Sequence, residues 1–260
     1  MSGHSKWATI KHRKGAADKA RGKLFAKLIR QVEVAAREGG GDLDANATLR
    51  TMYQKARDNS VPLDTIERAI KRGTGELEGV SYEQVTYEGY APGGVAMFVD
   101  TLTDNRNRTG SEIRSLFTRA GGSLAEPGAV AWQFERKGVV VVPAVAADSA
   151  EGEGAAPDED ELILVALDAG AEDVEREGDT WRVTAAAADT MAVREAIEAA
   201  GIAVTSADLT YAPQNLIELT SASEAKQVMA VLDALDDHDD VQGVYANFDI
   251  SDSLLEAIAG

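Results

Sequence analysis

The first thirty residues concentrate the side chains best able to bind an anionic partner. They contain nine Lys and Arg residues but only one acidic residue, Asp18. A helix over residues 19–41 would align four of these cations on one narrow stripe, because residues three and four apart are neighbours on a helix surface. They are Lys19, Lys23, Lys27 and Arg30. Cations at this spacing suit a row of phosphate groups, so the stripe is a candidate nucleic-acid contact.

A basic arm precedes this stripe and combines cations with aromatic rings. Its members are Lys6, Trp7, Lys11, His12, Arg13 and Lys14, and Arg21 adds a further cation on the helix. An aromatic ring among cations can stack on a base while the cations bind the backbone. The alternative is a solvated helix face, the usual meaning of a charged stripe. The nine-to-one imbalance favours the binding interpretation.

Two further polar clusters are second-tier candidates for nucleic-acid contact. The first, between a predicted strand and a predicted helix, consists of Asn105, Arg106, Asn107 and Arg108. It either contacts phosphate and base or simply caps the helix. The second, at the end of another predicted helix, consists of Arg68, Lys71 and Arg72. These cations either bind nucleic acid or only balance the partial negative charge at the end of the helix. Both alternatives stay open.

Charge is divided unevenly along the chain. The net charge is −18, and an anionic protein repels a polyanion. Residues 1–80 nevertheless hold 16 basic and 10 acidic residues, whereas residues 81–260 hold 10 and 34. This asymmetry predicts a basic contact module carried on an acidic body.

Other chemistry finds little support in the residues. The chain has no Cys, which excludes disulfides and thiolate zinc sites. The phosphate-loop, dinucleotide, zinc-protease and nucleophile-elbow motifs are all absent. His238 lies among four Asp residues at 236–240, but their spacing matches no calcium loop and favours a turn. We therefore predict no enzyme, with no catalytic residue, metal, cofactor or small-molecule substrate.

The sequence also predicts where the protein works. Its N-terminus is charged where a signal peptide is apolar, and no apolar run is long enough to span a membrane. We therefore expect a cytoplasmic protein without a membrane partner.

The elements that position these clusters follow from hydrophobic periodicity. Residues 1–80 predict three helices, ended by Gly39–Gly41 and Gly73, with Pro62 near the start of the third. Beyond them, strands are predicted over 85–90, 94–102, 129–134, 138–143, 173–177, 180–184, 202–209, 215–219 and 240–250. Helices are predicted over 107–119, 161–170, 192–201 and 222–235, and a flexible acidic loop over 147–160.

The order of these elements predicts an α+β, multidomain chain. Residues 1–80 form the basic arm and a three-helix bundle, followed by two α/β domains. Residues 138–210 follow the β-α-β-β-α-β order of a ferredoxin-like unit. The elements before this unit lack a second helix and a closing strand, which the elements after it supply. The unit is therefore predicted to be inserted into a discontinuous middle domain of residues 81–137 and 211–260.

Four parts of the chain have a distinctive sequence: GHSKWATIKHRK (3–14), RAIKRGTG (68–75), YEGYAPGGVA with LTDNRNRT (87–109), and VYANFDI (244–250). In these segments the chain resembles the YebC/PmpR family, whose mitochondrial relative is the translational activator of cytochrome c oxidase. The resemblance implies three domains and a nucleic-acid-binding regulator. By that analogy the N-terminal signature, which also includes Gly3, His4 and Ser5, touches RNA or DNA.

The resemblance leaves two main hypotheses, because members of the family are described both as DNA-binding transcriptional regulators and as translation factors at the ribosome. Duplex DNA binding requires an element that enters a groove, and no helix-turn-helix signature is evident. Ribosomal RNA offers an irregular surface that suits a basic arm on a small helical domain. An acidic protein-protein scaffold is a further alternative, but it leaves the N-terminal cations unexplained.

Overall fold

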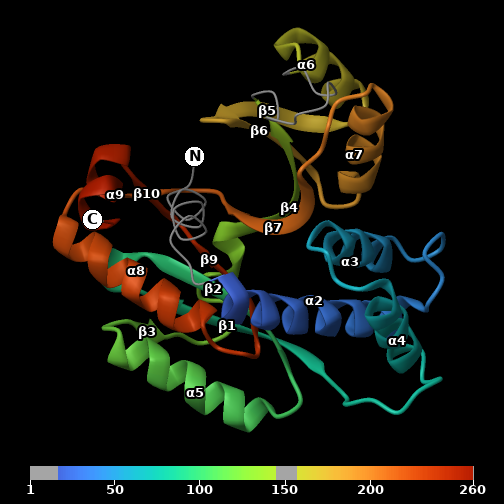
Figure 1. Cartoon of the computed structure of the whole chain (residues 1–260). Helices are drawn as coiled ribbons and strands as arrows, with labels where there is room; N and C mark the ends of the chain where they lie inside the picture. Colours follow the sequence, from blue (N-terminus) through green and yellow to red (C-terminus); the bar gives the residue numbers. More distant parts are fainter. Residues whose placement is uncertain (1–16, 145–156, 260) are drawn as a thin grey trace.

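Three helices form the first part of the structure, a computed structural model that describes residues 17–144 and 157–259. They are α2 (Ala17–Gly39), α3 (Ala47–Asp58) and α4 (Leu63–Gly73). Figure 1 shows α3 and α4 packed beside the C-terminal half of α2. Their shared core includes Leu28, Val32, Leu49 and Ile66, which are the apolar positions that helical spacing brings to one face.

Some predictions lie outside the described residues. The whole basic arm from Lys6 to Lys14 does, as do the side chain of Lys19 and residues 147–156 of the acidic segment. The described end of that segment enters a helix, α6 (Glu159–Asp168), which Asp158 caps by accepting a hydrogen bond from the backbone N–H of Glu161.

The middle sheet is antiparallel and is assembled from distant parts of the chain. Its order is β3 (Ser123–Leu124), β1 (Glu83–Tyr90), β2 (Ala96–Thr103) and β9 (Val241–Ala246). Helices α5 (Arg106–Arg119) and α8 (Ala222–Asp236) contribute side chains such as Phe117 and Leu232 to one core with Met97 and Val99 of β2. Near this sheet lie η1 (Pro92–Gly94), the parallel pair β8 (Ile217–Leu219) and β10 (Phe248–Ile250), and α9 (Asp252–Ala259).

The second sheet follows the ferredoxin-like pattern. Its strands are β4 (Phe134–Pro143), β5 (Ala171–Glu177), β6 (Thr180–Ala186) and β7 (Ser206–Pro213), in the order β5-β6-β4-β7. Helices α6 and α7 (Thr190–Ala199) pack on it through a core that includes Val140, Leu162, Val183 and Ile197. The chain is thus α+β, with helices first and two sheet domains after them, as the sequence predicts.

Apolar packing supports a division into domains. One cluster of buried side chains draws on residues 87–124 and 217–258, and another draws on residues 140–207. Strands β4 and β7 pair along their length from Phe134–Pro213 to Val141–Ser206 and so join the two parts. We propose the domains 1–80, 81–137 with 211–260, and 138–210 on this basis.

Three local predictions need correction. Residues 129–134 are not a strand, because Ala131–Gln133 form a 3₁₀ turn, η2, and β4 begins only at Phe134. The strand predicted over 202–209 begins at Ser206. The strand predicted over 240–250 is broken at Asn247, a buried residue whose amide donates to Gln133 and accepts from the backbone of Ala96. The backbone N–H of Asn247 still donates to the Ala96 carbonyl, but the Ala96 N–H donates to the Asn247 side chain and not to a backbone carbonyl.

Within the described part of the chain, no helix has both the length and the apolar character needed to cross a bilayer.

Candidate nucleic-acid interface

Helix α2 has one face in the bundle core and another that carries cations. Leu28 and Val32 are almost fully buried against α3 and α4. Three cations of the predicted stripe are Lys23, Lys27 and Arg30, and we call them the cation face. Arg21, also a candidate, is exposed on the same helix.

The cation face is not bare, because it meets the turn that follows α8. This acidic turn, residues 236–240, has the sequence DDHDD. Lys23 Nζ donates to the carbonyl oxygen of Asp237 at 3.0 Å and lies 3.7 Å from a carboxylate oxygen of Asp239. Lys27 Nζ donates to the Asp236 carbonyl oxygen at 2.8 Å and lies 3.6 Å from its carboxylate.

Arg30 completes the row of contacts. Its Nη1 donates to the carbonyl oxygen of Asp239 at 2.8 Å and to the carboxylate of Asp240 at 3.3 Å. Its guanidinium also lies over the ring of Tyr82, 5.3 Å from the centroid. The exposed fractions of the side chains are 40% for Lys23, 15% for Lys27 and 23% for Arg30. The turn therefore covers much of the cation face.

The end of α8 explains why the turn attracts cations. The last turn of a helix carries partial negative charge, which basic residues normally balance. In α8 that turn holds no basic residue but does hold Asp233 and Asp236, and Asp237 caps it. Lys23 and Lys27 instead supply the missing cations from more than two hundred residues away, and they bind two of the carbonyls at this helix end.

Asp240 is the point at which two of the predicted clusters meet. Its side chain is buried, and it accepts hydrogen bonds from Arg30 on Oδ1 and from Arg108 and Thr109 on Oδ2, the latter two at 2.8 and 2.7 Å. Burial alone would raise the pKa of Asp240, but the hydrogen bonds from Arg108 and Thr109 outweigh it and hold the pKa below its usual value. The carboxylate therefore stays charged between cations of α2 and α5.

The second-tier cluster at the start of α5 has mixed roles. Asn105 is the N-cap, and its side chain accepts from the backbone N–H of Arg108 at 3.1 Å. Arg108 binds both Asp104 and Asp240. Arg106 is 65% exposed, with a distant pair to Glu83 at 3.8 Å, and Asn107 is exposed. The cap therefore coexists with exposed polar side chains.

The other second-tier cluster lies on α4. Arg68 is exposed and pairs with Asp64 one turn earlier at 3.6 Å, and Lys71 is exposed. Arg72 instead binds the buried carboxylate of Glu33 on α2 at 2.8 Å. Arg72 thus holds α4 against α2.

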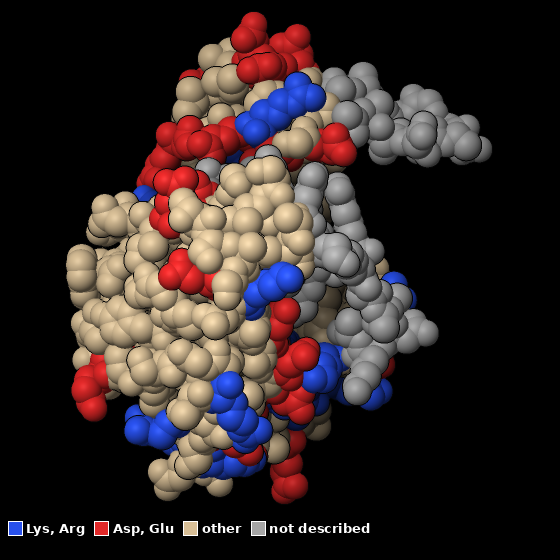
Figure 2. All heavy atoms as spheres, turned by 90° about the vertical axis from the view of Figure 1, so that its left-hand side faces the viewer, with Lys and Arg blue, Asp and Glu red and all other residues tan. Residues whose placement is uncertain are grey.

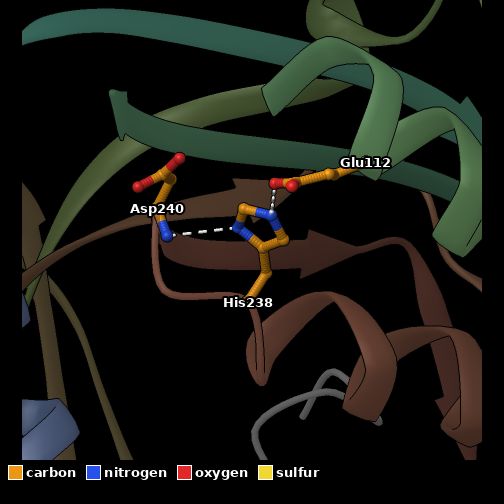
Figure 3. Close-up of side chains that lie close together, drawn as sticks. All are labelled: Glu112, His238 and Asp240. Atoms are coloured by element: carbon orange, nitrogen blue, oxygen red, sulfur yellow. Dashed lines mark hydrogen bonds and ion pairs between the residues drawn. The ribbon is translucent and has the colours of Figure 1, made fainter. Parts of the chain in front are cut away.

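A His–carboxylate group lies beside the acidic turn. In Figure 3 the ring of His238 lies between Glu112 of α5 and the backbone nitrogen of Asp240. Nε2 is 2.8 Å from the Glu112 carboxylate, and Nδ1 accepts from the Asp240 N–H at 3.1 Å. Although ligand atoms of the three residues lie within 4.8 Å of one another, Asp240 already binds two guanidinium groups. A metal ion here would meet those two cations, so the group is suited to shaping the turn.

The surroundings are polar and mixed in charge. A cleft of about 560 Å³ is lined by Lys23, Arg30, Tyr82, Asp104, Arg108, Glu112 and residues 237–240. Figure 2 shows acidic side chains gathered over the upper part of the molecule and Lys and Arg side chains at its lower end, where α5 lies. The exposed arginines of α5 are Arg106, Arg108, Arg114 and Arg119.

Sequence reasoning missed the partner of the cation face. The stripe was visible from helical spacing, but the acidic turn was interpreted only as a helix exit. A usable signal was present, because a helix that ends in several acidic residues and no basic one needs cations from elsewhere.

Comparison with known proteins identifies the family. Residues 5–76 match the family described as the TACO1/YebC protein N-terminal domain, and residues 82–248 match the TACO1/YebC second and third domain. A protein of Rubrobacter xylanophilus is 55% identical over all of both chains, and one of Halothermothrix orenii is 52% identical over 99% of each. Both are named "Probable transcriptional regulatory protein".

A solved structure agrees in fold over nearly the whole chain. The crystal structure of a conserved hypothetical protein from Aquifex aeolicus is 43% identical, covers 95% of this chain and 98% of its own, and superposes with a TM-score of 0.82. Both family matches, which together span most of the sequence, point the same way. The chain belongs to the TACO1/YebC family.

Proposed function

We propose that this protein is a non-enzymatic regulator of gene expression that acts by binding nucleic acid, with the cation face of α2 and the basic arm as its contact surface. The names of its relatives support the regulatory role. The charge division of the chain supports the nucleic-acid partner, because the basic residues are concentrated in the first eighty.

One observation carries the proposal. Lys23, Lys27 and Arg30 bind a row of oxygen atoms along the acidic turn, at 2.8 to 3.0 Å for the three shortest contacts. The bound atoms are carbonyl and carboxylate oxygens, and the phosphate oxygens of a nucleic-acid backbone would be similar acceptors for ammonium and guanidinium groups. The face is thus spaced for successive anionic or polar oxygens.

The first candidate is duplex DNA, with binding dominated by phosphate contacts and therefore weakly dependent on sequence. This candidate matches the names of the relatives as transcriptional regulators. The acidic body of the protein would then limit adsorption to DNA outside the contact surface.

A second candidate, structured ribosomal RNA, is favoured by the solvent face of α4. In a helix-turn-helix the N-terminal residues of the second helix contact base edges. Helix α4 follows α3 after a short turn, but exposes Asp64 and Glu67 in its first half. Carboxylates there would repel the DNA backbone in a groove, whereas a surface made of α2 and an arm suits irregular RNA. On this reading the protein acts on translation at the ribosome.

The test is the salt dependence of binding. We expect Lys23→Gln, Lys27→Gln and Arg30→Gln together to make the slope of log K against log salt shallower by about 3 units on duplex DNA, because each neutralised phosphate contributes about 0.9. Fluorescence anisotropy with a short labelled duplex, and in parallel with a labelled ribosomal RNA stem-loop, measures the slopes. The tighter complex at equal salt selects between the two candidates.

A matched control removes the same charge elsewhere. Arg57, Arg176 and Lys226 are exposed cations outside the cation face. Their conversion to Gln should leave both slopes nearly unchanged. Equal slopes for the wild-type protein and the cation-face variant would remove α2 from the contact surface.

A further inference from the structure

We propose that the acidic turn competes with nucleic-acid phosphates for the cation face, so that the protein on its own masks its binding surface and nucleic acid must displace the turn. This inference rests on the proposed function, because it concerns how the same surface is regulated. In the free protein, the acidic turn binds the cations that the phosphates of a nucleic acid would otherwise bind.

The acidic turn covers much of the cation face. The turn contacts each cation of the face, and Lys27 and Arg30 keep less than a quarter of their side-chain surface exposed. A duplex or an RNA helix is a broad, stiff ligand, and phosphates must approach a cation to within hydrogen-bonding distance. Nucleic acid and the acidic turn therefore compete for Lys27 and Arg30.

The contact between the face and the turn is also separable. Among the described residues, none of the clusters of buried apolar side chains contains residues from both the 17–73 helices and the 83–259 part. The contacts of Lys23 and Lys27 with the turn are exposed hydrogen bonds and long ion pairs. Such contacts are individually weak and are screened by salt, so a polyanion with many charges can replace them.

The turn behaves as a tethered anion. Asp236, Asp237 and Asp239 add negative charge close to a helix end that already carries partial negative charge, and Lys23 and Lys27 balance it. Because the turn and the cation face belong to one chain, the turn acts at a high effective concentration. The affinity for nucleic acid falls in proportion to the fraction of molecules in which the face is open.

The test neutralises the exposed acids of the turn and leaves Asp240 in place, since Asp240 also binds Arg108 and Thr109. We expect Asp236→Asn, Asp237→Asn and Asp239→Asn together to tighten binding of a short DNA duplex or ribosomal RNA stem-loop by about three- to tenfold at fixed salt, the size expected for a few exposed ion pairs. The control carries Glu126→Gln, Glu175→Gln and Glu195→Gln, three exposed acids outside the turn, and should bind nearly as the wild type does. Equal gains in both variants, or no gain in the turn variant, would overturn the proposal.

Two further measurements separate this inference from the proposed function. On the background of Lys23→Gln, Lys27→Gln and Arg30→Gln the gain from the turn variant should vanish, and its persistence would overturn the proposal. If the cation-face variant binds as the wild type does, the proposed contact surface has failed instead. In hydrogen exchange, saturating nucleic acid should speed exchange of the 237–241 amides in the wild-type chain, whereas slowed or unchanged exchange there would contradict displacement of the turn.

Discussion

Glu88 shows how one buried carboxylate shapes the backbone around it. Its two oxygens accept hydrogen bonds from the backbone N–H groups of Gly128, Val130 and Ala131, at 2.6, 2.6 and 2.8 Å. Burial alone would raise the pKa of Glu88, but these three bonds together lower it below the usual value. The bonds also take the N–H groups that a strand over 129–134 would use, so the segment turns instead.

We expect Glu88→Gln to lower the free energy of unfolding by about 1 to 3 kcal/mol, because a buried N–H group loses its charged acceptor. Urea unfolding at neutral pH measures this. The depressed pKa adds a pH signature, since the contribution of Glu88 is complete above the unfolded pKa of about 4.3 and is lost as the pH falls through the folded value. The Gln variant should lack that part of the acid dependence. Glu126→Gln, an exposed neighbour, is the control and should change little.

Residue types and spacing predicted the cation stripe but not the roles of individual side chains. Asn105 could cap a helix or contact a base, and its cap is now visible in the bond to Arg108. The binding of Arg72 to Glu33 was not predictable, because it joins two helices whose relative rotation depends on core packing. Sequence patterns report which side of a helix is apolar, not which polar partner faces the other side.

Gly73 lies where helices α4 and α2 approach each other closely. The sequence predicted that this residue lies just past α4, as a helix-ending glycine. It is instead the last residue of α4, and the left-handed backbone conformation occurs at Gly75, with φ of +84°. A Cβ on Gly73 would collide with the backbone oxygen of Glu33 and approach the Cβ of Ala36 to 2.7 Å. Gly73 therefore lets α4 pack directly on α2.

We expect Gly73→Ala to destabilise the protein by about 1 to 3 kcal/mol, as overpacking typically does. Gly22→Ala makes the matched comparison, since a Cβ on this exposed residue of α2 would meet nothing within 4 Å. That change should stabilise the protein by about 0.5 to 1 kcal/mol through helix propensity alone. Thermal unfolding of both variants provides the measurement, and equal shifts in the two would contradict a close-packing role for Gly73.

Most elements could be predicted from the sequence because their apolar periodicity is local. The three N-terminal helices, strands β1 and β2 of the middle sheet, and the ferredoxin-like order of elements were all predictable for this reason. The failures involve distant partners. The strand predicted over 240–250 is interrupted because Asn247 binds Ala96 and Gln133, about 150 and 114 residues away. Helix α9 was not predicted.

Among the described residues, polar contacts join the N-terminal helices to each of the two sheet domains. One is the acidic turn on α2. The other is on α3, where Asp58 receives a two-bond contact from the buried Arg194 of α7, at 2.6 and 3.2 Å, and Lys55 pairs with Asp208 of β7 at 3.0 Å. Domain contacts of this polar kind allow relative motion.

The contact between Asp58 of α3 and Arg194 of α7 can be tested by removing the charge of Asp58. Asp58→Asn removes the charged partner of Arg194 across the domain contact and leaves only Glu198 of its own helix, which is costly for a buried guanidinium. We expect the variant to be cut several times faster within residues 74–82, which connect α4 to β1, in limited proteolysis. Asp64→Asn, at an exposed pair within α4, should be cut at the wild-type rate. Unchanged cleavage of the Asp58 variant would show that this pair does not hold the helices in place.

The division of charge between the two parts of the chain was predictable from the sequence, but the contact between these parts was not. Counting residues separates a basic module from an acidic body. The two parts neutralise each other where residues 23–30 meet residues 236–240. The acidic end of α8 indicates that cations should bind there, but no local pattern shows which cations bind.

The two oxygens of Asp240 divide their partners between α2 and α5. Arg30 holds one oxygen, whereas Arg108 and Thr109 hold the other. Release of Arg30 would therefore leave Asp240 anchored to α5 through its second oxygen, even while residues 236–239 open. A turn anchored in this way at one end stays close to the cation face and can bind it again once the nucleic acid dissociates.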